Sequence, residues 1–389
     1  MILSLVLAMT DELGNIIMSI KKISTVKTLH GNIKLPLFMP DATRGFIKMC
    51  NNSELLSSGI AALVVNTFHL YLQPGIKIIK KAGGIHNFMN WDRPLLSDSG
   101  GFQIFSLIHK SKSLGKIDDN GAVFKSPIDG SRHEITPEKS IQIQFDLGTD
   151  FIVCLDDCPP YGFDEKSINL SVERTINWAQ RCYQEYIRQV KKRKMPESHR
   201  PKLIAVIQGG LSRDLRKKCL DGLLEVSDKK FLGESFSFAG YGFGARPIDE
   251  QGNFLFDILD YTAKIIPDDK IKFALGIGTP ADIYRCHKMG WNMFDCVIPT
   301  REGRHGKLYQ FKNQKDIKSV NFYKEINIKK SIFSNNFEKI NKYSKLLELN
   351  NNSLAYLQHL FKVNEGLGQK WASLNNLEFY ASLMKKISK

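Results

Sequence analysis

The most distinctive stretch of the chain runs from residue 292 to residue 306 and reads NMFDCVIPTREGRHG. It places the carboxylate of Asp295 inside an apolar run and follows it with two arginines, Arg301 and Arg304. Asp98 and Asp156 likewise follow apolar runs, in LLSDSGG and FIVCLDDC. Carboxylates that share one pocket serve as nucleophiles or as general acids and bases. A single aspartate in such a place is just as commonly a helix cap or a turn former, so the chemistry depends on whether the fold brings the three together.

Eight short apolar runs predict the elements that position these side chains. Between them, helix starts are marked by TPE at 136–138 and TPAD at 279–282, and residues 171–190 carry apolar side chains at helical spacing. Eight strands alternating with helices are typical of an α/β fold of the (β/α)8 TIM-barrel type. The runs cover residues 35–40, 61–68, 93–101, 150–158, 202–210, 236–244, 272–278 and 293–300.

Polar residues or glycines stand at or near the C-terminal ends of most of these runs. In a barrel of parallel strands those ends converge on one mouth, where the active site is built. The sequence therefore predicts a shared pocket. The residues concerned are Asn66, Asp98, Asp156, Gln208, Gly242, Gly276 and Asp295.

Composition limits the classes of partner. The 389 residues hold 55 Lys and Arg against 40 Asp and Glu, and the net charge of +15 suits a polyanion such as nucleic acid or an anionic membrane surface. A merely solubilising charge would look the same. The seven cysteines form no C-x-x-C pair, which favours a reducing, cytoplasmic compartment over a disulfide framework. The apolar start MILSLVLAM lacks a basic region and is soon interrupted by Asp11 and Glu12, so no membrane segment is expected.

Two weaker patterns have simpler structural explanations. GYGFGA, at 240–245, has glycines like those of a dinucleotide-binding loop but lacks the spacing of the third glycine. Cys154 and Cys158 are four residues apart, yet they lie on a predicted strand with no histidine nearby. Packing in a core is therefore favoured over metal binding.

Several long motifs, in order along the chain, resemble those of the tRNA-guanine transglycosylase family. The resemblance runs from about Pro36 to Gly306 and resumes in AYLQHL and NNLEFYASLMKKI near the end. Motifs of this length in this order are highly specific. They are NTFHLYLQPG (66–75), DSGGFQ (98–103), FKSPIDGSRHEITPEKSIQIQ (124–144), IQGG (207–210), GIGTPADI (276–283) and FDCVIPTREGRHG (294–306).

The resemblance implies an enzyme that removes guanine from the wobble position of a tRNA anticodon and inserts a 7-deazaguanine base, preQ1 or queuine, without cutting the RNA. Asp295 stands where the family has its nucleophile, which attacks ribose C1′ and holds the tRNA as a covalent ester. Asp98 matches the general acid and base, which protonates the departing guanine and later accepts a proton from the incoming base. No cofactor is expected.

The same resemblance implies a set of residues that bind the base. Asp156 would accept hydrogen bonds from the N–H groups on the pairing edge of the base, while Gln208 and the backbone N–H of Gly242 would read the carbonyl side. Phe102 and Leu275 would hold the flat ring between them.

Recognition of the tRNA and the choice of base involve further positions. Arg301 and Arg304 match family positions that contact the backbone of the anticodon loop. Cys158 resembles the pattern of bacterial members that use preQ1, whereas the small Ala245 would leave room for a larger base. The choice between preQ1 and queuine therefore stays open.

One departure from the family is large. Typical members hold a structural zinc with a C-x-C-x-x-C cluster and a later histidine, whereas this chain has Ser344, Leu346, Leu349 and Asn375 at those positions. We therefore expect no metal, and a helical C-terminal subdomain in which leucine packing replaces the zinc. The expected divisions are an N-terminal extension (1–22), the barrel (23–315) and this subdomain (316–389).

Two other classes of function remain open. A non-catalytic tRNA-binding subunit is expected to have lost its nucleophile or its base, but Asp98, Asp156 and Asp295 are all present. A base-exchange enzyme of the same fold could also act on another nucleic acid, and the missing zinc cluster is compatible with that. The expected partners are the anticodon loop of a tRNA and a 7-deazaguanine base, with a homodimer as a further option.

Overall fold

The structure is a computed structural model that describes residues 8–10, 16–18, 22–160, 162–249, 251–313 and 317–389. Most of the predicted N-terminal extension, residues 1–22, lies outside the described residues. Within it, β1 (Ala8–Thr10) and β2 (Ile16–Met18) pair as antiparallel strands.

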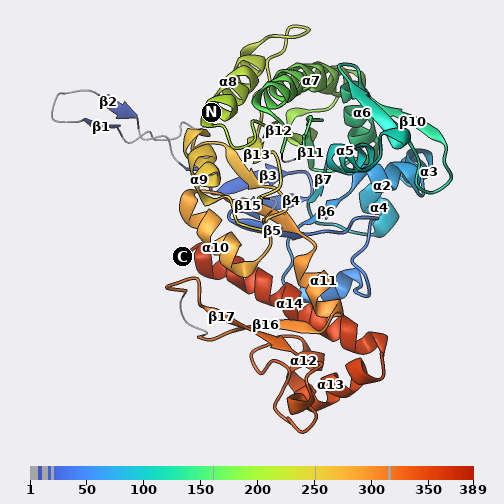
Figure 1. Cartoon of the computed structure of the whole chain (residues 1–389), viewed down its shortest axis with the longest axis vertical. Coiled ribbons are helices and arrows are strands. Elements are labelled where there is room, and N and C mark those ends of the chain that lie inside the picture. Colours follow the sequence, from blue (N-terminus) through green and yellow to red (C-terminus); the bar gives the residue numbers. More distant parts are fainter. Residues whose placement is uncertain (1–7, 11–15, 19–21, 161, 250, 314–316) are drawn as a thin grey trace.

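The centre of the molecule is a barrel of eight parallel strands (Figure 1). The strands pair in the order β5-β15-β14-β13-β12-β11-β7-β6, and a parallel bridge between Asp41 and Val64 joins the two ends of the sheet. Each of the eight predicted runs overlaps one strand, so the predicted TIM-barrel fold is confirmed. The strands are β5 (Leu37–Pro40), β6 (Leu63–Val65), β7 (Leu95–Ser97), β11 (Phe151–Val153), β12 (Lys202–Ile207), β13 (Gly240–Phe243), β14 (Ile271–Ala274) and β15 (Met293–Cys296).

Side chains along the strands alternate between the inside of the barrel and the layer beneath the helices. On β15, Met293 belongs to the inner cluster and Phe294 to the outer one. On β5, Leu37 and Met39 point inward while Phe38 points outward. This alternation decides which residues beyond the strand ends face the mouth.

Helices surround the barrel, and the two predicted capping signals are confirmed. Thr136 and Thr279 accept hydrogen bonds from the third residues of α6 and α10. None of the described helices combines the length and apolar character needed to cross a membrane. The helices up to the last barrel strand are α1 (Asn52–Ser57), α2 (Thr67–Leu72), α3 (Ile76–Lys81), α4 (Ile85–Met89), α5 (Gly101–Lys110), α6 (Pro137–Leu147), α7 (Glu165–Lys192), α8 (Arg213–Asp228), α9 (Phe256–Ile265) and α10 (Pro280–Met289).

Two antiparallel elements extend this plan. Strands β8 (Gly115–Asp118), β9 (Gly121–Lys125) and β10 (Arg132–Ile135) form a small sheet between α5 and α6. The hairpin of β3 (Thr25–Thr28) and β4 (Gly31–Lys34) closes the barrel floor, since Val26 and Ile33 join the inner cluster.

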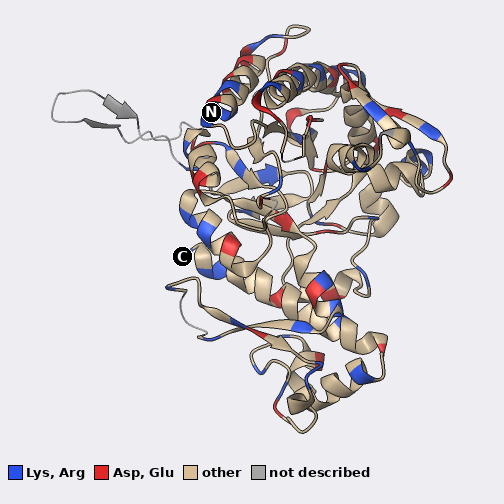
Figure 2. Ribbon diagram, in the orientation of Figure 1, with Lys and Arg blue, Asp and Glu red and all other residues tan. Residues whose placement is uncertain are grey.

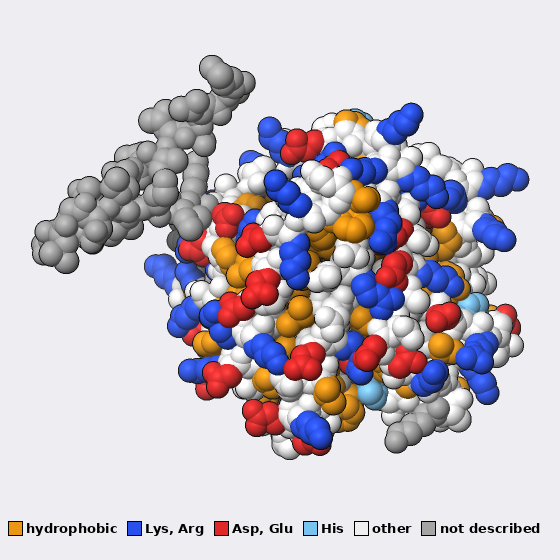
Figure 3. All heavy atoms as spheres, turned by 90° about the horizontal axis from the view of Figure 1, so that it is seen from above, with side chains coloured by type: hydrophobic (Ala, Val, Ile, Leu, Met, Phe, Trp, Pro, Cys, Tyr) orange, Lys and Arg blue, Asp and Glu red, His pale blue; other side chains and the backbone are white. Residues whose placement is uncertain are grey.

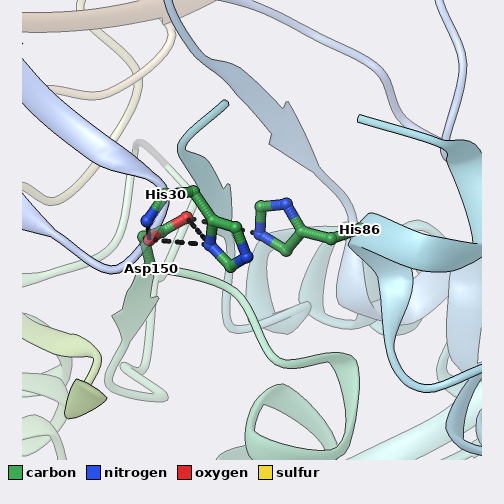
Figure 4. A group of neighbouring side chains, drawn as sticks. All are labelled: His30, His86 and Asp150. Carbon is green, nitrogen blue, oxygen red and sulfur yellow. Dashed lines mark hydrogen bonds and ion pairs between the residues drawn. The ribbon is translucent and has the colours of Figure 1, made fainter. Parts of the chain in front are cut away.

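A buried carboxylate fastens the floor hairpin to the barrel (Figure 4). Asp150, just before β11, accepts hydrogen bonds from the amides of His30 and Leu95, and its oxygens lie 3.1 Å from His30 Nδ1 and 3.3 Å from His86 Nε2. These contacts hold the pKa of Asp150 at about 2 although burial opposes this. The two imidazole rings are stacked at 3.5 Å and 14°. His30 Nδ1 and His86 Nε2 lie 3.1 Å and 3.3 Å from the same oxygen, Asp150 Oδ2, so the two stacked rings share this carboxylate.

The C-terminal segment supplies one wall of the barrel. Helix α14 (Gly366–Ile387) packs against β5, α1, α10 and α11 (Ile298–Arg304), and Figure 1 shows it between the barrel and the remaining C-terminal elements. A Cβ added to Gly303 would lie 2.7 Å from the Ser373 backbone, so α11 and α14 touch at this glycine. The remaining elements are the hairpin β16 (Lys307–Phe311) with β17 (Tyr323–Asn327) and the helices α12 (Leu347–Asn351) and α13 (Leu354–Lys362). The boundary predicted at residue 315 stays a prediction.

The four positions that would hold zinc in typical relatives do not fit a metal here. Leu346 and Leu349 are buried and have no donor atom. Ser344 donates a hydrogen bond to Glu378, and Asn375 is fully buried, donating to the Tyr309 carbonyl oxygen. Burying a leucine stabilises a fold by about 1.5–3 kcal/mol. Apolar packing and side-chain hydrogen bonds thus occupy the place where a metal would join these segments.

We expect the protein to fold and act without zinc, because this packing leaves no ligand set to fill. Thermal unfolding and enzyme activity should be unchanged after prolonged treatment with a strong chelator, and elemental analysis of the dialysed protein should find no stoichiometric zinc. Activity lost in chelator and restored by zinc would contradict the prediction.

Candidate active site

Asp295 lies at the C-terminal end of β15, where the alternation turns it toward the barrel mouth. The amide of Gly276, after β14, donates a hydrogen bond of 2.9 Å to its Oδ1 atom. Among the described residues no side chain donates to either carboxylate oxygen, so Oδ2 is available for attack. Burial raises the pKa of Asp295 to about 6, against the lowering effect of the Gly276 amide. The group is therefore mostly ionised at neutral pH and poorly solvated, a state that favours nucleophilic attack.

Asp98 follows β7 and is held by donors from two directions. The Thr67 amide donates to Oδ1 at 2.8 Å, the Gly100 amide donates to the same atom at 3.2 Å, and Asn66 Nδ2 donates to Oδ2. Burial nevertheless raises the pKa of Asp98 to about 7, and the charge of Asp295 adds to this shift. A carboxyl group with a pKa near the working pH can both give and take a proton.

The side chains of Asp156 and Gln208 meet directly. Gln208, buried at the end of β12, donates a hydrogen bond of 2.7 Å from Nε2 to Asp156 Oδ2. Burial raises the pKa of Asp156 to about 6, while this hydrogen bond lowers it. The pair presents a carboxylate acceptor and an amide next to each other, which is complementary to the N–H and C=O groups on one edge of a purine.

Two residues position Gln208. A Cβ at Gly244 would lie 2.5 Å from Gln208 Nε2, so only glycine leaves room for the amide. Arg216, fully buried, donates to the carbonyl oxygens of Ile207 and Gly244 and lies 3.9 Å from the centre of the Phe243 ring. Its guanidinium fixes the loops that follow β12 and β13.

The other predicted base-binding residues fall into two groups. A Cβ at Gly242 would lie 2.8 Å from Leu275 Cδ1, so the leucine side chain lies over the backbone of this glycine. Phe102, half exposed, and Cys158 line one cavity of about 360 Å³ together with Arg246. Burial raises the pKa of the Cys158 thiol to about 12, which keeps it neutral.

Tyr241 and Phe243, which flank Gly242 in the sequence, are fully buried in the outer cluster. Their side chains face the helices, away from the mouth, so they do not line the base pocket. Ala245 adopts a φ of 105°, a conformation that is strained for any residue with a Cβ.

Arg301 and Arg304 lie on α11, immediately after the Asp295 strand. Arg301 is exposed and has a weak contact with Glu302, 3.5 Å from Nε to Oε1. Arg304 lines a cavity of about 520 Å³ with Lys48 and Lys329. Helix α11 thus carries cations from the end of β15 toward a basic hollow.

Elsewhere on the surface, charges of both signs are mixed. Figure 2 shows basic and acidic residues side by side along the outer helices, and Figure 3 shows the same mixture on the face turned to the viewer. The positive excess therefore forms no separate patch on that face.

Comparison with known proteins shows the family of the chain. Residues 18–389 match the family model described as queuine tRNA-ribosyltransferase. The chain belongs to this family. Its relatives include the queuine tRNA-ribosyltransferase of Halothermothrix orenii, 37% identical over 366 residues that cover 94% of this chain and 89% of the relative. That of Fusobacterium nucleatum is 40% identical over 364 residues, covering 92% and 88%. The family resemblance drawn from the motifs is confirmed.

Within this queuine tRNA-ribosyltransferase barrel, the mouth divides into two halves. Strands β11 to β14 carry the predicted base-binding residues Asp156, Gln208, Gly242 and Leu275. Strand β15 carries Asp295, and β5 and β7 are followed by Asp41 and Asp98, while β6, which lies between β5 and β7, is followed by Asn66. The roles of the individual residues remain predictions.

Three residues around the mouth had no predicted role. Asn66 was recognised as a polar strand end, and it donates to Asp98 while capping α2. Asp41 follows β5 and interacts electrostatically with both Asp295 and Asp98. The alternation Leu37, Met39, Asp41 could have revealed it. Arg216 had no sequence signal, because its partners are backbone carbonyl groups.

Proposed function

We propose that the protein is a tRNA-guanine transglycosylase that exchanges guanine at the anticodon wobble position for a 7-deazaguanine base, through a covalent intermediate with Asp295. One observation carries the proposal. Two carboxyl groups with a raised pKa, Asp98 and Asp295, lie at the same barrel mouth as Asp156 and Gln208, whose polar atoms are complementary to the edge of a purine base. Membership of the family supports the same conclusion.

In the first half-reaction, Asp295 Oδ2 attacks C1′ of the ribose. The bond from C1′ to the guanine nitrogen breaks, and protonated Asp98 gives its proton to the departing base. The positive charge that develops on the sugar lies beside ionised Asp295, which becomes a neutral ester.

In the second half-reaction, the incoming 7-deazaguanine loses its ring N–H proton to Asp98. Its nitrogen attacks C1′ and displaces the Asp295 carboxylate, which regenerates both groups. Asp156 and Gln208 bind each base in turn by its polar edge, and Phe102 and Leu275 contact its faces. An unpaired anticodon base is readily flipped out of its stack, which suits such a pocket.

The finer points of substrate and assembly belong to the same proposal. The added base is preQ1 or queuine, and the neutral thiol of Cys158 borders the site where its side chain would extend. A cytoplasmic location fits the tRNA substrate and the free cysteines. A homodimer is proposed as well, since Phe46 and Met49 expose apolar side chains at the edge of the barrel.

The function is tested by incubating the protein with mixed tRNA and labelled guanine or labelled preQ1, then mapping the incorporated base by nuclease digestion and mass spectrometry. Incorporation at the first anticodon position is expected. Incorporation elsewhere, or into DNA alone, would favour the alternative of a related base-exchange enzyme. Binding of tRNA without any exchange would favour the non-catalytic subunit.

The two arginines give a separate prediction. Replacing Arg301 or Arg304 with glutamine should weaken tRNA binding and reduce the slope of log Kd against log salt by about one ion per lost phosphate contact. Lys34→Gln, an exposed change on the floor hairpin at the other end of the barrel, is the matched control and should leave the slope unchanged. Equal slopes in wild type and both arginine variants would refute the phosphate contacts.

A further inference from the structure

We propose that Asp41 is a third carboxyl group of the active site that hydrogen-bonds the 2′-hydroxyl of the nucleotide undergoing exchange, and so makes the enzyme select RNA over DNA. The proposal deepens the proposed function and rests on it.

Strand geometry places Asp41 at the mouth. Leu37 and Met39 on β5 belong to the inner cluster, so alternation turns Asp41, the next residue of this parity, toward the same interior. Met39 is the register partner of Asp295 on β15, and Asp41 is bridged to Val64 on β6. Asp41 therefore lies one pleat nearer the mouth than Asp295.

The surroundings of Asp41 are acidic and short of partners. Among the described residues none donates a hydrogen bond to its carboxyl group. Burial raises the pKa of Asp41 well above its usual range, and the charges of Asp295 and Asp98 add to this effect. Burial and the neighbouring charges thus favour the protonated form of Asp41, and a protonated carboxyl can both donate and accept a hydrogen bond.

The substrate must present its sugar to this side. The base-binding residues occupy β11 to β14, so a nucleotide with C1′ at Asp295 directs its ribose toward β5 and β6. In an RNA chain the 3′ and 5′ oxygens are in phosphodiester bonds, and the 2′-hydroxyl is the one free hydroxyl. It is attached to the carbon next to C1′, and it is both donor and acceptor, as the protonated Asp41 is.

The test is a double-mutant cycle between Asp41 and the 2′-hydroxyl. Exchange of labelled guanine is measured as kcat/KM for wild type, Asp41→Ala and Asp41→Asn, each with a tRNA carrying guanosine or 2′-deoxyguanosine at the exchanged position. Any intrinsic change in the reactivity of the deoxynucleotide is common to all three enzymes and cancels in the cycle.

Removing the 2′-hydroxyl should lower kcat/KM more in wild type than in Asp41→Ala. We expect the two decreases to differ by a factor of up to about ten, which corresponds to the free energy of one hydrogen bond. Asp41→Asn keeps a donor and an acceptor and should discriminate as wild type does. Equal discrimination in wild type and Asp41→Ala would overturn the proposal, because a purely structural residue lowers both rates alike.

Failure of the underlying function gives a different result. If wild type exchanges no base into either tRNA, the proposed function is wrong, and the assignment of Asp41 falls with it. If Asp41→Ala does not fold, the comparison of wild type with Asp41→Asn tests the proposal. Full activity of wild type on the deoxynucleotide tRNA would contradict it. So would a folded Asp41→Asn variant that no longer discriminates between the two tRNAs.

Discussion

Replacing Asp295 with asparagine should abolish base exchange while leaving the affinity for tRNA nearly unchanged. The amide has almost the same shape as the carboxylate but cannot form the ester at C1′. Phosphate contacts, which dominate affinity for RNA, are predicted for other residues, Arg301 and Arg304. Exchange is measured by incorporation of labelled guanine, and affinity by filter binding at fixed salt.

The covalent intermediate offers a second readout of the same change. Wild type mixed with tRNA should give a protein–RNA adduct that survives denaturing electrophoresis, and Asp295→Asn should give none. Asp92→Asn is a matched control, because this aspartate has a side chain that is 78% exposed and stands before β7 at the other end of the barrel. Undiminished exchange in Asp295→Asn would remove Asp295 from the role of nucleophile.

Replacing Asp98 with asparagine should lower kcat by about 10²- to 10⁴-fold, the usual contribution of a general acid or base. The amide keeps the hydrogen bonds of the carboxyl group only in part, since its oxygen can still accept from the Thr67 and Gly100 amides but its NH2 group cannot accept from Asn66. Circular dichroism and thermal unfolding therefore serve as the control for folding. A kcat within about threefold of wild type would show that another group moves the proton.

The pH dependence of kcat/KM separates the two carboxyl groups. Asp295 must be ionised, so activity is present above its pKa of about 6 and is lost as the pH falls through that value. Asp98 must be protonated for guanine to leave, so activity is present below its pKa of about 7 and is lost as the pH rises through it. The wild-type profile should be a narrow bell. Because the carboxyl groups interact, its two apparent pKa values describe the set of carboxyl groups together and not each residue separately. Residual activity of Asp98→Asn should lack the alkaline limb.

The strands and the predicted capping signals could be predicted from the sequence because they depend on local patterns. The eight runs are short, apolar and bounded by turn residues. Thr136 and Thr279 are recognisable as helix N-caps from the three residues that follow each of them. The shared mouth was predictable for the same reason, since parallel strands bring their C-terminal ends together.

Features that depend on distant segments were not predictable. Asp41 lies one residue beyond the first apolar run, which ends at Pro40, although it has the same parity as the inward-facing Leu37 and Met39. The stacked pair of His30 and His86 on Asp150, and the contact of Gly303 with Ser373, join residues that no local pattern relates. The direction of a side chain such as Tyr241 was decided by strand register, which the sequence alone did not fix.

The position of α14 has a consequence for the order of events during translation. Strand β5 (Leu37–Pro40) is among the first barrel elements to leave the ribosome, yet the helix that covers it ends at Ile387. Tyr380 and Asn376 of this helix donate hydrogen bonds to the Gly278 and Pro299 carbonyl oxygens, which flank the Asp295 strand. The outer face of β5 therefore stays uncovered until about 350 further residues have been made, whereas the Asp295 strand, β15, waits for only about 90. Unfinished chains would hence expose apolar barrel surface to chaperones and proteases, and would not hold Asp295 in its place at the barrel mouth.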